Sequence, residues 1–125
     1  MARDAEAPEK RAKKCEDEDA RAREERAVVC AACNHALTKT SARIEVDGAH
    51  EHAFANPAGL TFRIACFKGA PGCRGFGEES TVWTWFKGYA WRVTLCGACG
   101  EHVGWAYRSD ASAFFGLITA RIKTQ

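Results

Sequence analysis

The chain divides near residue 26 into a charged segment without hydrophobic periodicity and a longer segment of short hydrophobic runs. Residues 1–26 carry 8 basic and 9 acidic side chains and no aromatic residue, and they present no apolar stripe that could dock a helix. Their Ala, Glu, Lys and Arg content favours helix, but without such a stripe we expect a disordered or frayed extension, with a partner-binding arm as the alternative. All aromatic residues lie within residues 27–125, so we expect the folded domain there.

Beyond residue 26, β-branched and aromatic residues form short runs between turn residues, which is typical of antiparallel strands. We expect strands over 60–67, 82–86, 90–95 and 103–107, a loop over 69–77, and a strand or a short helix over 114–122. An alternating run at 43–46 ends at Asp47-Gly48, a strong hairpin signal, and the Asn-Pro-Ala-Gly sequence at 56–59 predicts a second turn. The pattern predicts an all-β domain.

Charge and hydropathy exclude several classes of protein. The net charge of +2 arises from 18 basic and 16 acidic side chains, so the chain lacks the basic surplus that nucleic-acid binding needs. No run of 18 apolar residues occurs, and the chain begins with charged residues, so we expect neither a membrane span nor a secretory signal. We expect a cytoplasmic monomer with reduced thiols.

Four of the seven cysteines form two C-x-x-C motifs at 30–33 and 96–99. Small residues between the cysteines of each motif let both sulfurs converge on one point, and two such motifs supply the four thiolates of a structural zinc site. Redox chemistry is the alternative for a single C-x-x-C, but no βαβ pattern surrounds either motif. We predict one structural Zn²⁺, without an open coordination position for catalysis, held by Cys30, Cys33, Cys96 and Cys99.

The remaining cysteines and the histidines have less specific surroundings. Cys66 lies in an apolar run and is expected to pack as a small hydrophobe, whereas Cys73 lies in the glycine-rich loop, a position that is compatible with exposure. A nucleophile–resolver pair is the alternative for these two, and Cys15 is expected to be a free thiol. Histidines that follow the C-x-x-C motifs are candidate donors to the metal ligands, but we expect a surface position for each of His35, His50, His52 and His102.

All four tryptophans fall between residues 83 and 105. Because residues two apart share a face of a strand, the aromatic residues here fall into three pairs, Trp83/Trp85, Tyr89/Trp91 and Trp105/Tyr107. Gly88 lets the chain reverse, so the first two pairs can face each other across a hairpin. Two interpretations stay open at this point. Either the rings form the core of a small domain, or their faces form a box for a small, flat or cationic group.

The ordered series of motifs over residues 27 to about 120 resembles the CULT domain, the thalidomide-binding domain of cereblon. The series consists of the first C-x-x-C, Asn56-Pro57, Trp-Phe-x-Gly-Tyr-Ala-Trp at 85–91, the second C-x-x-C, and Gly-Trp-x-Tyr at 104–107. In length the chain is similar to the stand-alone bacterial members of that family. The resemblance implies two antiparallel sheets, roughly perpendicular to each other and pinned by zinc, an architecture called the β-tent.

The resemblance also implies a set of ligand-binding residues, which are Asn56, Phe62, Trp83, Trp85, Trp91, Trp105 and Tyr107. The tryptophans at 85, 91 and 105 would form the walls of an aromatic cage, and Tyr107 would close its base. The backbones at 83 and 85 would meet the imide, and the residues at 56 and 62 would lie on the loop and strand that cover the pocket. Relatives often carry histidine or another polar residue where this chain has Trp83, which alters the rim of the pocket.

The function implied by the resemblance is non-enzymatic binding of cyclic imides of the glutarimide type. Thalidomide-type ligands, peptides or metabolites ending in a cyclic imide, and uridine-like rings share the relevant donor–acceptor edge. The alternatives are an enzyme on the same fold, either similar to one class of methionine sulfoxide reductases or processing cyclic imides, and a zinc ribbon that binds nucleic acid. We do not predict an enzyme, because no cysteine follows Cys99 as the late nucleophile of a reductase, and no activated nucleophile or open metal site for imide hydrolysis is visible. We do not predict nucleic-acid binding, because residues 27–125 hold only 10 basic against 7 acidic side chains.

Overall fold

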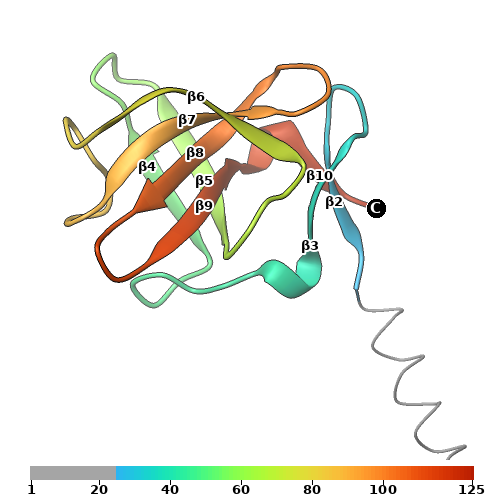
Figure 1. The fold of residues 1–125 in the computed structure, drawn as a ribbon, viewed down its shortest axis with the longest axis horizontal. Helices are drawn as coiled ribbons and strands as arrows, with labels where there is room; N and C mark the ends of the chain where they lie inside the picture. Colours follow the sequence, from blue (N-terminus) through green and yellow to red (C-terminus); the bar gives the residue numbers. More distant parts are fainter. Residues whose placement is uncertain (1–24) are drawn as a thin grey trace, which may run out of the picture.

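The structure, a computed structural model, describes residues 25–125 (Figure 1). Nearly all of the predicted N-terminal extension, including Cys15, lies outside the described residues. Its last two residues, Glu25 and Arg26, are described. The backbone N–H of Arg26 donates to Oγ1 of Thr40 at 2.9 Å, and the backbone N–H of Thr40 donates to the carbonyl of Arg26 at 2.9 Å.

The described part of the chain consists of β-strands and two 3₁₀ turns. In chain order the elements are β2 (Ala27–Cys30), β3 (Ala36–Lys39), η1 (Thr40–Ala42), β4 (Glu51–Ala55), β5 (Thr61–Phe67), β6 (Cys73–Ser80), β7 (Ala90–Cys96), β8 (His102–Arg108), β9 (Ala113–Ile118), η2 (Thr119–Arg121) and β10 (Ile122–Thr124). They form a three-stranded sheet, β10-β2-β3, and a six-stranded sheet, β4-β5-β9-β8-β7-β6. Every neighbouring pair is antiparallel, which confirms the predicted all-β class with two antiparallel sheets. Between residues 25 and 125 no helix is long and apolar enough to cross a membrane.

The small sheet runs across one end of the large sheet (Figure 1). The turn between β2 and β3 and the turn between β7 and β8 lie side by side at this junction. Below them, side chains from both sheets form one hydrophobic core, including Val28 and Leu37 of the small sheet and Phe67, Val103 and Leu117 of the large sheet. The two sheets are thus joined by a shared hydrophobic core, and the two C-x-x-C turns lie at the same junction.

A second hydrophobic core lies within the large sheet and supports the tryptophans. Its buried members are Ile64, Cys66, Phe86, Tyr107, Phe114 and Ile118. Trp85, Trp91 and Trp105 are only partly buried and pack against this cluster. Other side chains thus form the buried centre of this core, and the three indoles pack around it.

Most of the predicted strands are confirmed. The runs at 60–67, 90–95 and 103–107 correspond to β5, β7 and β8, and the run at 114–122 is a strand followed by a 3₁₀ turn. The hairpin at Asp47-Gly48 is also confirmed, because Val46 and Ala49 exchange backbone hydrogen bonds around it and both central residues have positive φ.

Two of the predicted elements are wrong. The predicted loop at 69–77 gives way to strand β6 at Cys73, which pairs with β7 at the edge of the large sheet. As an edge strand with exposed residues on both faces, β6 lacks the hydrophobic alternation that marks a half-buried strand. The predicted strand at 82–86 is a turn, because Trp83 has a φ of 60°, which extended chain cannot accommodate.

Gly104 on β8 allows β8 and β9 to approach closely. A Cβ atom at this position would lie 2.1 Å from the carbonyl oxygen of Gly116 and 2.9 Å from Cα of Leu117, which are both backbone atoms. We therefore expect Gly104→Ala to lower the melting temperature by about 10 °C or more, equivalent to roughly 2 kcal/mol for a domain of this size. Gly69→Ala is the matched control, because a Cβ there meets no atom within 4 Å. Equal melting temperatures for the two variants in thermal denaturation would contradict this account of the β8–β9 contact.

Candidate functional site

The four cysteines of the two C-x-x-C motifs meet at the junction of the sheets. Their Sγ atoms all lie within 4.8 Å of one another, with Cys30 and Cys99 at 3.7 Å and Cys33 and Cys96 at 3.6 Å. A tetrahedral site with Zn–S bonds of about 2.3 Å has S···S edges of about 3.8 Å. The sulfur positions therefore fit a tetrahedral zinc ion. They do not fit a disulfide, whose S–S bond is about 2.05 Å.

The two C-x-x-C turns have the same backbone geometry. In the first turn the backbone carbonyl of Cys30 accepts a hydrogen bond from the backbone N–H of Asn34. In the second turn the backbone carbonyl of Cys96 accepts one from the backbone N–H of Gly100. Asn34 and Gly100 both have positive φ, 66° and 80°, in the left-handed region that asparagine and glycine tolerate. Each turn wraps its backbone around one point and directs two sulfurs toward it, which is the arrangement that a metal ligand pair requires.

The surroundings of Cys96 favour its ionised form. Burial raises the pKa of this thiol, but donors around the sulfur outweigh burial and lower the pKa to about 7. They include the backbone N–H groups of Cys99 and Ala98, of which the Ala98 N–H lies 3.4 Å from the sulfur. A thiolate is the form that binds zinc, so Cys96 can act as a metal ligand near neutral pH.

The other two described cysteines are buried in separate places. Cys66 is fully buried in the second core, as predicted. Cys73, for which the sequence left exposure open, is half-buried and packs against the core below the four cysteines. Burial raises the pKa of Cys66 to about 11 and that of Cys73 to about 12. Both remain thiols at neutral pH, which disfavours a nucleophile–resolver pair.

A cavity of about 340 Å³ opens beside β7 and β8, within the size range of small-molecule sites. Its lining residues are Asn56, Pro57, Val82, Trp83, Trp85, Trp91, Val93, Trp105 and Tyr107. Six of the seven residues assigned to a ligand site by resemblance therefore line one pocket. Phe62 does not line it, and instead packs against the rings of Trp85 and Trp105, with centroid distances of 6.2 and 5.4 Å.

Four tryptophans line this cavity, and three of them, Trp85, Trp91 and Trp105, are partly buried. Trp85 and Trp105 meet edge to face, with ring centroids 4.9 Å apart and an interplanar angle of 74°. Trp91 lies on β7, beside Tyr107 of β8, and within residues 25–125 its ring contacts neither of the other two indoles. Since all three rings line the same cavity, the space between Trp91 and the other pair is open to a small ligand.

Hydrogen bonds from two indoles fix the walls to neighbouring loops. Nε1 of Trp91 donates to the carbonyl of Val82 at 2.8 Å, which ties the 81–89 turn to β7. Nε1 of Trp85 donates to the carbonyl of Ala55 at 3.2 Å, which ties the same turn to the end of β4. The two bonds satisfy both indole N–H groups, so neither group requires a ligand as its partner.

Tyr107 is the most deeply buried of the residues that line the cavity. Only 2% of its surface is exposed, and its ring stacks with Phe114 at 5.0 Å and meets Phe86 edge to face at 4.8 Å. Burial raises the pKa of its hydroxyl, so the hydroxyl stays protonated. Tyr107 therefore contributes a tightly packed, uncharged side chain to the lining of the cavity.

Two residues that support the walls were not identified from the sequence. Phe54 of β4 stacks on Trp85 with ring centroids 5.0 Å apart and an interplanar angle of 12°. His52 stacks on Phe54 in turn, and its Nε2 lies 2.8 Å from the carbonyl of Val46. The prediction that His50 and His52 are solvated is wrong, because both are half-buried and contact backbone carbonyls of the 44–49 hairpin. The alternation of His52 and Phe54 along one strand face was the signal available in the sequence.

His35 and His102, which follow the C-x-x-C motifs, also differ in their positions. His35 is exposed, as predicted. His102 is half-buried, which contradicts its predicted surface position, and its Nε2 lies 3.0 Å from the carbonyl of Gly104. The His102 ring meets Trp105 edge to face at 4.9 Å, so it links the β7–β8 turn to a wall of the cavity.

Two backbone groups of the 81–89 turn, in residues that line the cavity, have no hydrogen-bond partner within the described residues. Within the described residues, neither the carbonyl of Trp83 nor the backbone N–H of Trp85 forms a hydrogen bond. Asn56 uses its side-chain oxygen to accept the backbone N–H of Leu60 at 2.9 Å, which closes the 56–59 turn and leaves its amide NH₂ as a donor. The lining thus combines apolar ring faces with a small number of hydrogen-bonding groups.

No protein-family model matches the chain. Protein cereblon from Drosophila melanogaster is 38% identical to it over 52 residues, a match that covers 38% of this chain and 9% of that protein. Protein cereblon from Drosophila virilis is 36% identical over 52 residues and is covered to 8%. The match thus spans less than a tenth of the length of these curated relatives. The similarity supports a cereblon-like relationship for the matched region.

Proposed function

We propose that this protein is a zinc-stabilised, CULT-like module that binds cyclic imides of the glutarimide type and does not transform them. The observation that carries this proposal is the cavity lined by the indoles of Trp85, Trp91 and Trp105 next to the unpaired backbone groups of the 81–89 turn. A glutarimide ring is neutral and compact, with an aliphatic edge on one side and an imide edge on the other. The lining offers a matching partner to each edge.

The aliphatic edge fits the indole faces, because burying apolar surface between rigid rings costs little side-chain entropy. The imide edge presents one N–H donor between two carbonyl acceptors. We propose that the Trp83 carbonyl accepts the imide N–H, that the Trp85 N–H donates to one imide carbonyl, and that the Asn56 amide is available to the other. Uridine-like rings and peptides ending in a cyclic imide carry the same edge and belong to the same proposed ligand class.

The lining supports binding rather than chemistry. Its side chains are those of asparagine, proline, valine, tryptophan and tyrosine, and none of these is a general base at neutral pH. The cysteines outside the C-x-x-C motifs have raised pKa values because they are buried, so they are poor nucleophiles. A metal ion bound by four thiolates has no open position for substrate, and zinc at this site would act by holding the two sheets together.

Comparison of glutarimide with N-methylglutarimide tests the proposed hydrogen bonds. Methylation removes the donor, leaves the Trp83 carbonyl unpaired in the occupied site and adds bulk where the backbone approaches, so we expect binding about tenfold or more weaker. Binding is measured by tryptophan fluorescence, because three indoles enclose the ligand. Succinimide should bind, but more weakly than glutarimide, because its smaller ring fills less of the cavity. Equal affinities for glutarimide and its N-methyl derivative would refute imide recognition by the 81–89 turn.

A further inference from the structure

Cys73 lies directly opposite Cys96, one of the four clustered cysteines, on the neighbouring strand. The two residues face each other in the antiparallel ladder between β6 and β7. Their backbone N–H groups donate elsewhere, to the carbonyls of Ala70 and Glu101, so the two residues form a non-hydrogen-bonded pair. In such a pair the side chains share a face of the sheet and the Cα atoms lie about 4.5 Å apart. A disulfide needs a Cα separation of about 4.4–6.8 Å, so the ladder holds these two cysteines at the required spacing.

Cys96 also contacts a cysteine that dissolved reagents can reach. Cys33 is exposed whereas Cys96 is buried, and their Sγ atoms lie 3.6 Å apart. Cys73, in contrast, is half-buried and packs against the hydrophobic core that contains Cys30 and Cys96. Because oxidation of cysteine depends on thiolate character and exposure, an oxidant reacts with Cys33 more readily than with Cys73. Cys96 therefore has an accessible neighbour and a shielded one.

We propose that Cys73 and Cys96 are an oxidation site, at which a peroxide converts them into a reversible cross-strand disulfide. The peroxide transfers an oxygen atom to the Cys33 thiolate, which gives a sulfenic acid and a hydroxide ion. The Cys96 thiolate attacks the Cys33 sulfur, so an S–S bond forms and a second hydroxide leaves. Cys73 then attacks the Cys96 sulfur, the bond to Cys33 breaks, and the Cys73 proton passes to Cys33, which leaves as a thiol. The hydroxides take protons from solvent, so the peroxide is reduced to two water molecules while Cys73 and Cys96 together lose two electrons.

Cys73 can perform the last step although its burial makes it a poor nucleophile toward dissolved reagents. The strand ladder holds it next to Cys96, and reactions between groups held in place gain a very high effective concentration. The product also lies against the hydrophobic core, where solvent thiols reach it less easily than a bond to the exposed Cys33. We therefore expect oxidation to end at the Cys73–Cys96 bond.

This disulfide would weaken the connection between the two sheets. Cys73 and Cys96 both lie in the large sheet, on β6 and β7, so a bond between them does not reach the small sheet. It does remove one thiolate from the group of four, and the three that remain bind zinc less tightly. We expect oxidation to release the metal. This consequence rests on the zinc of the proposed function, whereas formation of the disulfide does not.

Peptide mapping of the full chain after treatment with hydrogen peroxide tests the pairing. Trypsin cleaves after lysine and arginine, so Cys73 falls in the peptide 69–74 and Cys96 in the peptide 93–108. We expect the main disulfide-linked product to join these two peptides, and fragmentation to place the bond at Cys96 rather than at Cys99. Dithiothreitol should reverse the link. A colorimetric chelator should detect about one released zinc ion per chain.

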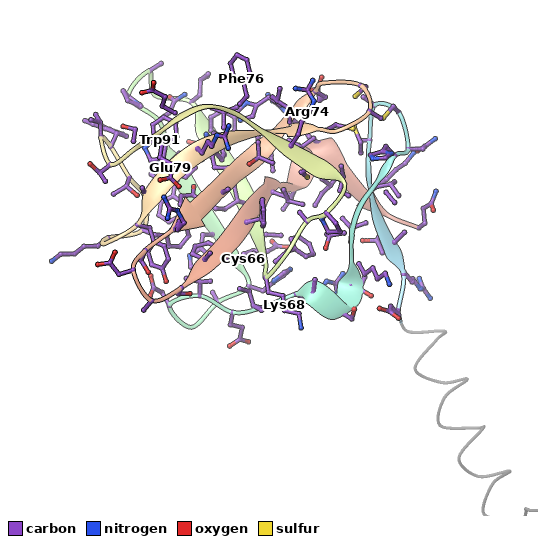
Figure 2. The ribbon with its side chains drawn as sticks, viewed as in Figure 1. Cys66, Lys68, Arg74, Phe76, Glu79 and Trp91 are labelled. Carbon is purple, nitrogen blue, oxygen red and sulfur yellow. The ribbon has the colours of Figure 1, made fainter. Side chains whose placement is uncertain are left out.

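Cys66→Ser is the matched control. Cys66 is also a buried cysteine, but it lies on β5 in the second core, well away from the C-x-x-C turns (Figure 2). This variant should give the same linked peptides as the unaltered protein. Cys73→Ser should instead accumulate the preceding bond, which joins the peptide 27–39, with Cys33, to the peptide 93–108.

The outcomes separate the oxidation site from the zinc site. If the unaltered protein forms mainly the link between 27–39 and 93–108, or if Cys73 stays a free thiol, the proposed oxidation site is refuted. If the Cys73–Cys96 bond forms in a protein that contained no zinc, the zinc of the proposed function fails while the oxidation site stands.

Discussion

Substituting serine for any one of the four clustered cysteines is expected to unfold the described domain. Cys30 lies at the end of β2 in the small sheet and Cys96 at the end of β7 in the large sheet, so a metal ion bound by both would link the two sheets directly. The apparent binding free energy of a structural zinc site is about 10–16 kcal/mol, as large as the whole stability of an ordinary domain, which is about 5–15 kcal/mol. Losing one thiolate therefore removes a contribution that the small hydrophobic cores cannot replace.

Metal content and circular dichroism measure this effect together. The unaltered protein should contain one zinc ion per chain, and a strong chelator should produce the same loss of structure as Cys30→Ser or Cys99→Ser. Cys73→Ser is the matched control, because Cys73 packs close to the cluster but lies outside the group of four sulfurs. It should retain zinc and lose only about 1 kcal/mol of stability. A folded, zinc-free protein would show that the cysteine cluster is not a structural metal site.

The cysteine cluster could be predicted from the sequence because its chemistry is local. A C-x-x-C turn brings two sulfurs together within four residues, so each half of the site is specified by neighbouring residues and only the meeting of the halves depends on the fold. The left-handed residue that closes each turn is visible as Gly100 in the second motif. In the first motif the equivalent residue is Asn34, which is less conspicuous but tolerates the same conformation.

The tryptophan segment shows where sequence patterns become insufficient. An aromatic residue at every second position predicts a strand, and that rule holds at Trp105 and Tyr107 of β8. It fails at Trp83 and Trp85, because Trp83 has a positive φ and the chain turns there. A tryptophan rarely adopts this conformation, so the residue type does not predict the turn. The two side chains therefore reach the cavity from a turn, with different exposures, rather than from one face of a hairpin.

The support of the cavity walls depends on pairings between distant segments. Phe54 and Phe62 face each other across β4 and β5, and both pack against Trp85, which lies more than twenty residues further along the chain. β4 is short and only half-buried, so its hydrophobic pattern is weak. Phe62 was assigned to the cover of the pocket by resemblance. In the structure Phe62 packs behind Trp85 and Trp105 and does not line the cavity. A phenylalanine would suit either position, so the residue type alone does not distinguish them.

The second large effect is expected from the walls of the cavity. Trp91→Ala and Trp105→Ala should each weaken glutarimide binding by at least about a hundredfold, because a central aromatic wall commonly contributes about 2–4 kcal/mol to binding. The two variants should differ in stability. Trp105 contacts the rings of Trp85, Phe62 and His102, so its removal also leaves these rings without a neighbour. Trp91 contacts none of the three within the described residues, so Trp91→Ala should keep a higher melting temperature than Trp105→Ala.

Trp91→Phe separates the two contributions of this wall. Phenylalanine keeps an aromatic face toward the cavity but cannot donate to the carbonyl of Val82, so the 81–89 turn loses its bond to β7. If the bond positions the turn, binding should fall by about tenfold, between the unaltered protein and Trp91→Ala. If only the ring face matters, Trp91→Phe should bind almost as well as the unaltered protein. Unchanged affinity in Trp91→Ala, with the protein shown to be folded, would contradict the cage, because Trp91 is one of the three indoles proposed to hold the bound ring.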